Sequence, residues 1–154
     1  MKYRELGKTG LKVSEIGLGC EGFNGKDAAF TQEMFKLALA AGVNCMDLYS
    51  PNPEMHKNIA AALGSRKDFI YQAHLCTEWK DGQYKAVRDI TSVKAAFETM
   101  LKNLNTDYID IGMIHYVDSP ELWRTIESGG VLDYALELKA KGKIKHIGVS
   151  SHNP

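Results

Sequence analysis

Two polar side chains stand at positions where buried strands are expected to end. Residues 110–114 lead directly into His115, and residues 43–46 lead into Asp47. In parallel α/β proteins, the carboxyl ends of the strands gather the loops that carry chemistry. Because an imidazole changes its charge near neutral pH, His115 with Asp47 as its partner is a candidate catalytic pair. The simpler alternatives are a core histidine with satisfied hydrogen bonds and an ordinary strand-end cap.

A third expected strand, residues 69–75, brings further candidates. Side chains alternate along a strand, so His74 and Cys76 should point to one face and Leu75 to the other. Both side chains could then line the same opening at the carboxyl ends of the strands. Histidine and cysteine are good ligands for zinc or iron, but no two of His74, Cys76 and His115 have the local spacing of a metal motif. We therefore predict no metal site.

Aromatic and amide side chains near these strand ends have open interpretations. Tyr49 is either a reactive phenol or a ring packed under a loop. Trp79 and Tyr84 fall in a long polar stretch that we expect to be a loop, where they would cover a substrate or fold back on the loop itself. Asn52 is explained by helix capping, because Asn52 followed by Pro53 is a typical helix start.

The elements that must position these residues alternate along the chain. We predict a β-hairpin over residues 1–13, with glycines at its turn. Strands are expected at 16–20, 43–48, 69–75, 108–115 and 144–150, and helices at 31–41, 52–64, 91–104, from 119, and up to 141. Alternating strands and helices predict an α/β fold with a parallel sheet and helices outside it.

Length and composition narrow the class of protein. The 154 residues are expected to form a single domain, 1–154. Lys+Arg and Asp+Glu both number 19, which gives no electrostatic reason to expect nucleic acid or an anionic membrane as partner. We find no signal peptide and no membrane-spanning run. Three widely spaced cysteines, Cys20, Cys45 and Cys76, predict free thiols in a reducing cytoplasm.

The chain resembles the aldo-keto reductase family in several stretches that follow one another in order: residues 3–14, 16–19, 42–47, 104–115 and 142–150. The resemblance implies a (β/α) TIM-barrel type of fold, here an N-terminal β-hairpin plus about five of the eight βα units of a closed barrel. Residues 46–54 and 74–76 are most similar to a bacterial branch of the family. Members of that branch often carry a ferredoxin-like iron–sulfur segment near the C-terminus.

The same resemblance implies a catalytic tetrad of Asp, Tyr, Lys and His. The tyrosine protonates the carbonyl oxygen as hydride arrives, the lysine, held by the aspartate, lowers the tyrosine's pKa, and the histidine orients the carbonyl. Asp47 and His115 match the aspartate and histidine positions. His74 takes the lysine position. The tyrosine position falls on Asn52 without a gap, or on Tyr49 if the loop is shorter than usual.

The implied cofactor is NADP or NAD, and the implied substrate is a small aldehyde or ketone. Ser150 fits the position that contacts the nicotinamide carboxamide, and Ser151 replaces the usual Asn beside it. The residues that bind phosphate and adenosine belong to strands seven and eight, beyond the five strands predicted here.

Two other interpretations remain open. The chain is a non-catalytic half-barrel whose unpaired edge strands join a second copy or a partner chain, or it is the N-terminal part of a longer protein that supplies the missing C-terminal half.

Overall fold

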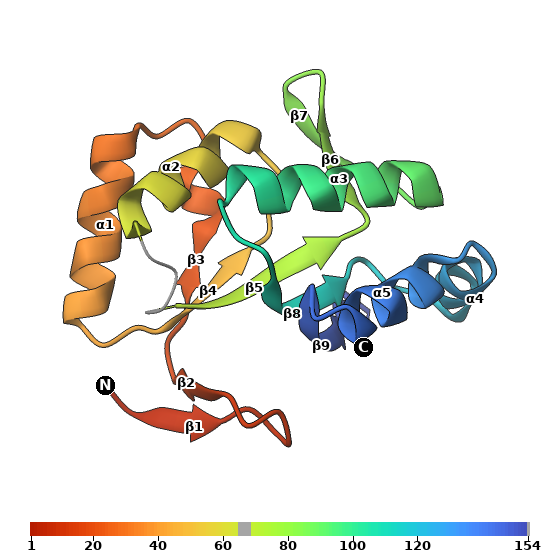
Figure 1. The fold of residues 1–154 in the computed structure, drawn as a ribbon, viewed down its shortest axis with the longest axis horizontal. Coiled ribbons are helices and arrows are strands. Elements are labelled where there is room, and N and C mark those ends of the chain that lie inside the picture. The colour runs from red at the N-terminus through yellow and green to blue at the C-terminus, as the bar shows by residue number, and fades with distance from the viewer. Residues whose placement is uncertain (65–68, 154) are drawn as a thin grey trace.

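A parallel sheet forms the centre of the computed structural model, which describes residues 1–64 and 69–153 (Figure 1). Its strand order is β3-β4-β5-β8-β9, so neighbouring strands follow one another along the chain. The strands are β3 (Leu18–Gly19), β4 (Cys45–Leu48), β5 (Ile70–Leu75), β8 (Ile109–Ile114) and β9 (Ile144–Val149). Every neighbouring pair is parallel. The predicted strands are confirmed, although β3 is shorter than expected: it begins only at Leu18, and a 3-10 helix, Cys20–Phe23, follows it at once.

Helices connect the strands and cover the sheet. They are α1 (Ala28–Ala40), α2 (Pro53–Leu63), α3 (Ile90–Asn103), α4 (Pro120–Ser128) and α5 (Val131–Ala140). Four of them begin at a polar side chain that accepts a backbone N–H, which satisfies a donor that the helix itself cannot pair; the caps are Asp27, Asn52, Asp89 and Ser119. The predicted capping role of Asn52 is confirmed, since its Oδ1 accepts from the N–H groups of Glu54 and Met55.

The core lies between the helices and the sheet. Its largest buried side chains come from both layers and include Phe35, Met46, Ile59, Tyr71 and Ile114. Phe35 of α1 packs edge-to-face on Phe69, with ring centroids 5.2 Å apart. The backbone ladder between the strands sets their register, and the register determines which side chains meet at the carboxyl edge of the sheet.

The predicted N-terminal hairpin is formed by β1 (Tyr3–Glu5) and β2 (Lys12–Ser14). The backbone N–H of Ser14 donates to Asn44 Oδ1 at 2.7 Å. Since Asn44 precedes β4, the hairpin is attached at the amino end of the sheet. It therefore lies at the opposite end from the candidate catalytic residues.

A second hairpin corrects the sequence prediction. The stretch expected to be a long polar loop forms two antiparallel strands, β6 (Thr77–Lys80) and β7 (Gln83–Ala86), which project from the sheet in Figure 1. Asp81 and Gly82 form its turn with φ of 54° and 74°. An Asp-Gly pair with two positive φ angles forms a turn whose twist matches that of two paired strands. A hairpin therefore forms here although the segment is polar.

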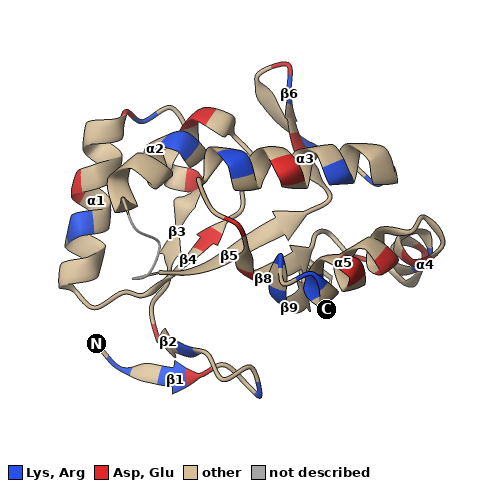
Figure 2. Cartoon of the chain, viewed as in Figure 1, with Lys and Arg blue, Asp and Glu red and all other residues tan. Residues whose placement is uncertain are grey.

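Acidic and basic residues are mixed along α1, α2 and α3 (Figure 2). This distribution agrees with the equal numbers of acidic and basic residues. Within the described ranges, no helix is both long and apolar enough to cross a membrane.

Candidate active site

The parallel register brings three predicted residues together at the carboxyl edge of the sheet. His74 Nε2 lies 2.8 Å from Asp47 Oδ1, and His74 Nδ1 lies 2.7 Å from His115 Nδ1. Asp47 lies near the end of β4, His74 lies near the end of β5, and His115 directly follows β8. His74 and His115 are 8% and 2% exposed. The predicted partnership of Asp47 with His115 is therefore indirect, because His74 stands between them.

Ser150 joins this cluster and Ser151 does not. Ser150 Oγ lies 2.8 Å from His115 Nδ1 and accepts from the backbone N–H of Tyr116 at 3.2 Å. Ser151 is exposed, and its Oγ accepts from the backbone N–H of Asn153. Of the two serines assigned to the cofactor by resemblance, only Ser150 faces the histidines.

Tyr49 lies beside the histidines but pairs with another phenol. Its hydroxyl is 2.6 Å from the hydroxyl of Tyr116, and its ring centroid is 5.3 Å from that of His115. Burial, followed by the hydrogen bond to Tyr116, raises the pKa of Tyr49 to about 12. A phenol with a raised pKa is a weaker acid than a free tyrosine. Tyr49 therefore has the right place for a proton donor, but its surroundings raise its pKa and do not lower it.

Tyr84 of the β6–β7 hairpin covers this group of rings. It stacks on Tyr49 with centroids 5.5 Å apart and an interplanar angle of 16°, and it meets His115 edge-on at 6.1 Å. Its predicted role as a cover is consistent with this position. Trp79 stands opposite Tyr84 in the hairpin register but lines a different cavity.

Arg88 holds the backbone that carries these residues, a role that no sequence pattern predicted. Its Nη2 donates to the carbonyl oxygens of His115 and Tyr116 at 2.9 and 3.2 Å, and its Nη1 donates to Cys76 and Val87 at 3.3 and 2.9 Å. Cys76 and Tyr116 have φ of 69° and 55°, an unfavourable conformation for side chains other than glycine. One guanidinium thus braces the two strained turns that follow β5 and β8.

Burial and charge set the protonation states. Burial, with the nearby charges of His74 and Arg88, lowers the pKa of His115 to about 3, so its ring is neutral at pH 7. Burial alone would raise the pKa of Asp47, but the hydrogen bond and the charge of His74 outweigh it and lower that pKa. Burial raises the pKa of the Cys76 thiol, which makes it a poor nucleophile.

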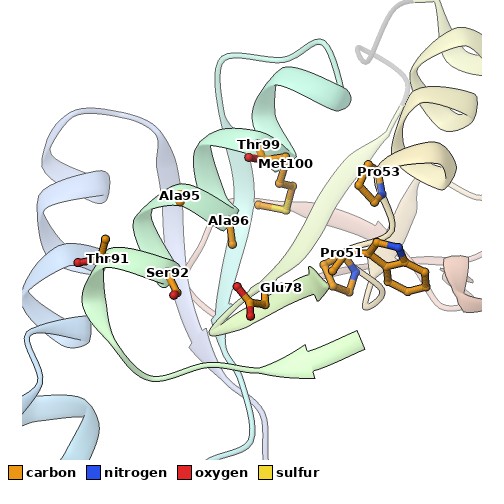
Figure 3. A pocket seen from close by; sticks show the side chains of 10 residues that line it. Pro51, Pro53, Glu78, Thr91, Ser92, Ala95, Ala96, Thr99 and Met100 are labelled. Carbon is orange, nitrogen blue, oxygen red and sulfur yellow. The ribbon is translucent and has the colours of Figure 1, made fainter. Parts of the chain in front are cut away.

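Two cavities lie near the site. One of about 320 Å³ on the inner face of the sheet is lined by Asp47 together with Gly19, Met46 and Gln72. The other, of about 280 Å³, lies between α3, the start of α2 and the β6–β7 hairpin (Figure 3), where Pro51, Pro53 and Glu78 face the side of α3. Its lining includes none of the cluster residues, so of these two cavities the inner-face one is the cavity that touches the cluster, through Asp47.

The residues present fit the carboxamide end of a nicotinamide. A hydroxyl has one donor and two acceptor positions, and Ser150 uses two of the three on Tyr116 N and His115 Nδ1. One position stays available for a carboxamide. His115 Nε2 is buried and has no hydrogen-bond partner among the described residues. Across the same residues, no group of three or more His, Cys, Asp or Glu side chains is arranged to hold a metal ion.

The sheet consists of sequential parallel strands with helices outside it, which is a barrel-type α/β architecture. The candidate site lies at the carboxyl ends of the strands, where barrels of this type carry their active sites. Comparison with known proteins gives the family. The model of the Aldo/keto reductase family matches residues 15–154, and the chain belongs to this family.

Relatives and solved structures support the same assignment. The aldo-keto reductase YhdN of Bacillus subtilis is 29% identical, over 98% of this chain and 47% of its own length. The uncharacterized oxidoreductase YqkF of the same organism is 30% identical, over 100% of this chain and 50% of its own. The holo form of the aldo-keto reductase AKR11C1 from Bacillus halodurans superposes with a TM-score of 0.81 at 30% identity, covering 100% of this chain and 51% of that one.

The chain thus spans about half the length of the curated relatives that it matches. The predicted partial barrel of the aldo-keto reductase type is confirmed by these structures.

Proposed function

We propose that this chain carries the catalytic half of an NAD(P)H-dependent oxidoreductase that reduces a small aldehyde or ketone. The observation that supports this most directly is the contact of Asp47, His74 and His115 at the strand ends, where aldo-keto reductases keep their active site. The free thiols of Cys20, Cys45 and Cys76 support a cytoplasmic location.

The side chains divide the work in this proposal. When bound, the nicotinamide would supply the hydride that goes to the carbonyl carbon. Ser150 would hold the carboxamide through its remaining hydrogen-bond position, and His115 would face the carbonyl oxygen through the unpaired Nε2. Tyr49 and Tyr84 would shield the reacting atoms from water, which strengthens hydrogen bonds within the site.

Turnover by the full-length protein tests the proposal. We expect NADPH or NADH to be oxidised in the presence of small aldehydes or ketones. The decrease in absorbance of the reduced nicotinamide measures this reaction. General acid–base groups contribute factors of 10² to 10⁴, so His115→Ala should lower kcat by about 100-fold or more. Arg124→Ala, on the exposed side of α4, is the matched control and should leave kcat unchanged. Absence of turnover with either nucleotide would exclude this function, and turnover that His115→Ala does not lower would exclude a catalytic role for His115.

A further inference from the structure

The two histidines share one proton. Two ring nitrogens 2.7 Å apart cannot both present lone pairs or both present hydrogens, so His74 Nδ1 and His115 Nδ1 have a single hydrogen between them. The other nitrogen of His74, Nε2, faces the Asp47 carboxylate at 2.8 Å. An ionised carboxylate only accepts, so His74 Nε2 always carries a hydrogen.

These constraints leave two states. In the first, His74 is neutral, the shared hydrogen belongs to His115 Nδ1, and His115 Nε2 is a bare acceptor. In the second, His74 is an imidazolium paired with Asp47, the shared hydrogen belongs to His74 Nδ1, and His115 carries its hydrogen on Nε2. The Ser150 hydroxyl can rotate to suit either state. His115 is neutral in both, in agreement with the lowered pKa of its buried ring.

We propose that His115 Nε2, and not a tyrosine, donates the proton to the carbonyl oxygen, and that His74 replaces it from the imidazolium form that Asp47 holds. This inference rests on the proposed function. As hydride reaches the carbonyl carbon, the Nε2–H proton of His115 goes to the oxygen and the shared proton moves from His74 Nδ1 to His115 Nδ1. The alcohol leaves, the cluster is in its first state, and one proton taken from solvent at His115 Nε2 restores the second.

Three observations favour the imidazole over the phenol. His115 Nε2 is a buried polar atom without a partner in the described part of the chain, and such an atom costs about 1–3 kcal/mol unless a ligand or water satisfies it. The Tyr49 hydroxyl lies 2.6 Å from the Tyr116 hydroxyl, and burial together with this bond raises its pKa, which makes it a weaker proton donor. His74 is at the lysine position, and its two ring nitrogens face Asp47 and His115 at hydrogen-bond distance. Neither nitrogen is therefore available for a hydrogen bond to a phenol.

Charged and titratable groups surround His115 on every side. Asp47 comes from β4 and His74 from β5. Tyr84 comes from β7, and Arg88 from the segment that follows β7. The strand-end loops contribute Tyr49, Tyr116 and His152. Of these, His74 is the titratable group in hydrogen-bond contact with His115 Nδ1.

Nitrogen NMR of the histidine rings tests the switch without turnover. In the ¹⁵N-labelled chain, we expect the single hydrogen of His115 to move from Nδ1 to Nε2 as pH falls, at the same midpoint as proton uptake by His74. His74→Phe keeps a ring but removes both nitrogens, so the pH-dependent switch of His115 should vanish. His74→Lys places a permanent cation there and should keep the hydrogen on Nε2 from pH 6 to 9. A tautomer of His115 that ignores the charge at position 74 would overturn the proposal, whatever the turnover.

Kinetics of the full-length protein separate this inference from the proposed function. His115→Gln should lower kcat by about 100-fold or more and Tyr49→Phe by less than about tenfold. In the wild type, kcat should fall above the pH at which the spectra show His74 losing its proton. Turnover that survives His115→Gln but not Tyr49→Phe would refute the imidazole donor and leave the reductase function standing. No turnover in the wild type would refute both, with the spectra still reporting whether the two rings share a proton.

Discussion

The Arg88 Nη2 group donates to the carbonyl oxygen of His115 at 2.9 Å. This contact ties a residue from the segment before α3 to the strand end that carries the candidate proton donor. The same guanidinium also reaches Cys76, so the positions of His74 and His115 depend on one cation.

Removal of Arg88 should therefore loosen the site and the fold together. Arg88→Ala deletes the charge-assisted hydrogen bonds to the carbonyl groups of Cys76, His115 and Tyr116, and we expect a loss of about 3 kcal/mol in the free energy of unfolding. Arg88→Lys should recover only part of this loss, because an ammonium cannot match the planar fork of the guanidinium. Urea unfolding measures both. Arg124→Ala, whose partner Glu121 is exposed, should cost about 0–1 kcal/mol; equal losses at the two arginines would contradict the bracing role.

Gly112 in β8 is required by a close contact with β9. A Cβ at this position would lie 2.5 Å from Ile144 Cδ1 and 3.0 Å from Ile144 Cγ2. Gly112→Ala should destabilise the chain by about 1–3 kcal/mol through overpacking. Ile144→Val removes Cδ1, so the double variant should lose less than the sum of the two single changes. Gly19→Ala meets no atom within 4 Å and is the matched control. Strictly additive losses would show that Gly112 and Ile144 do not crowd each other.

Tyr84 should control how far His115 is shielded from water. Burial is the main cause that lowers the pKa of His115 to about 3. Tyr84→Ala opens the cover, so the His115 pKa should rise toward the ordinary histidine value of about 6.5. Tyr84→Phe keeps the ring over Tyr49 and should leave the pKa low. The pH dependence of the His115 ring proton shifts in NMR measures this. A rise in both variants would assign the effect to the hydroxyl and not to burial.

His56 should make the fold sensitive to acid. Burial, opposed by the hydrogen bond from Nε2 to the Ser50 carbonyl, lowers its pKa to about 4. Between pH 6.5 and 4 the unfolded chain takes up a proton at this position and the folded chain does not. The contribution of His56 to the free energy of unfolding is therefore complete above pH 6.5. As the pH decreases from 6.5 to 4, this contribution decreases by about 1.4 kcal/mol per pH unit.

Unfolding measured across this range in variants isolates that contribution. His56→Gln keeps an N–H donor for Ser50 but does not titrate, so its stability should fall less steeply with acid than that of the wild type. Arg124→Ala leaves every histidine in place and should keep the wild-type slope. Identical slopes in His56→Gln and the wild type would assign the acid sensitivity to other groups.

Local patterns predicted the main elements of the fold. The strand leading into His115, the helix start at Asn52 and the parallel alternation of elements follow from periodicity and capping, which act over a few residues. The β6–β7 hairpin was missed because its polar composition concealed the Asp81-Gly82 turn.

Family resemblance and strand ends together predicted where Asp47, His74 and His115 would gather. The sequence alone determined which residue types stand at those ends, because the chemistry of a side chain belongs to the residue itself. Only the tertiary structure decided which atoms meet: His74 between Asp47 and His115, Tyr49 on Tyr116, and Arg88 on two strained turns. These contacts join residues 12 to 67 positions apart. Their geometry depends on strand register and packing across the whole sheet, which no local pattern specifies.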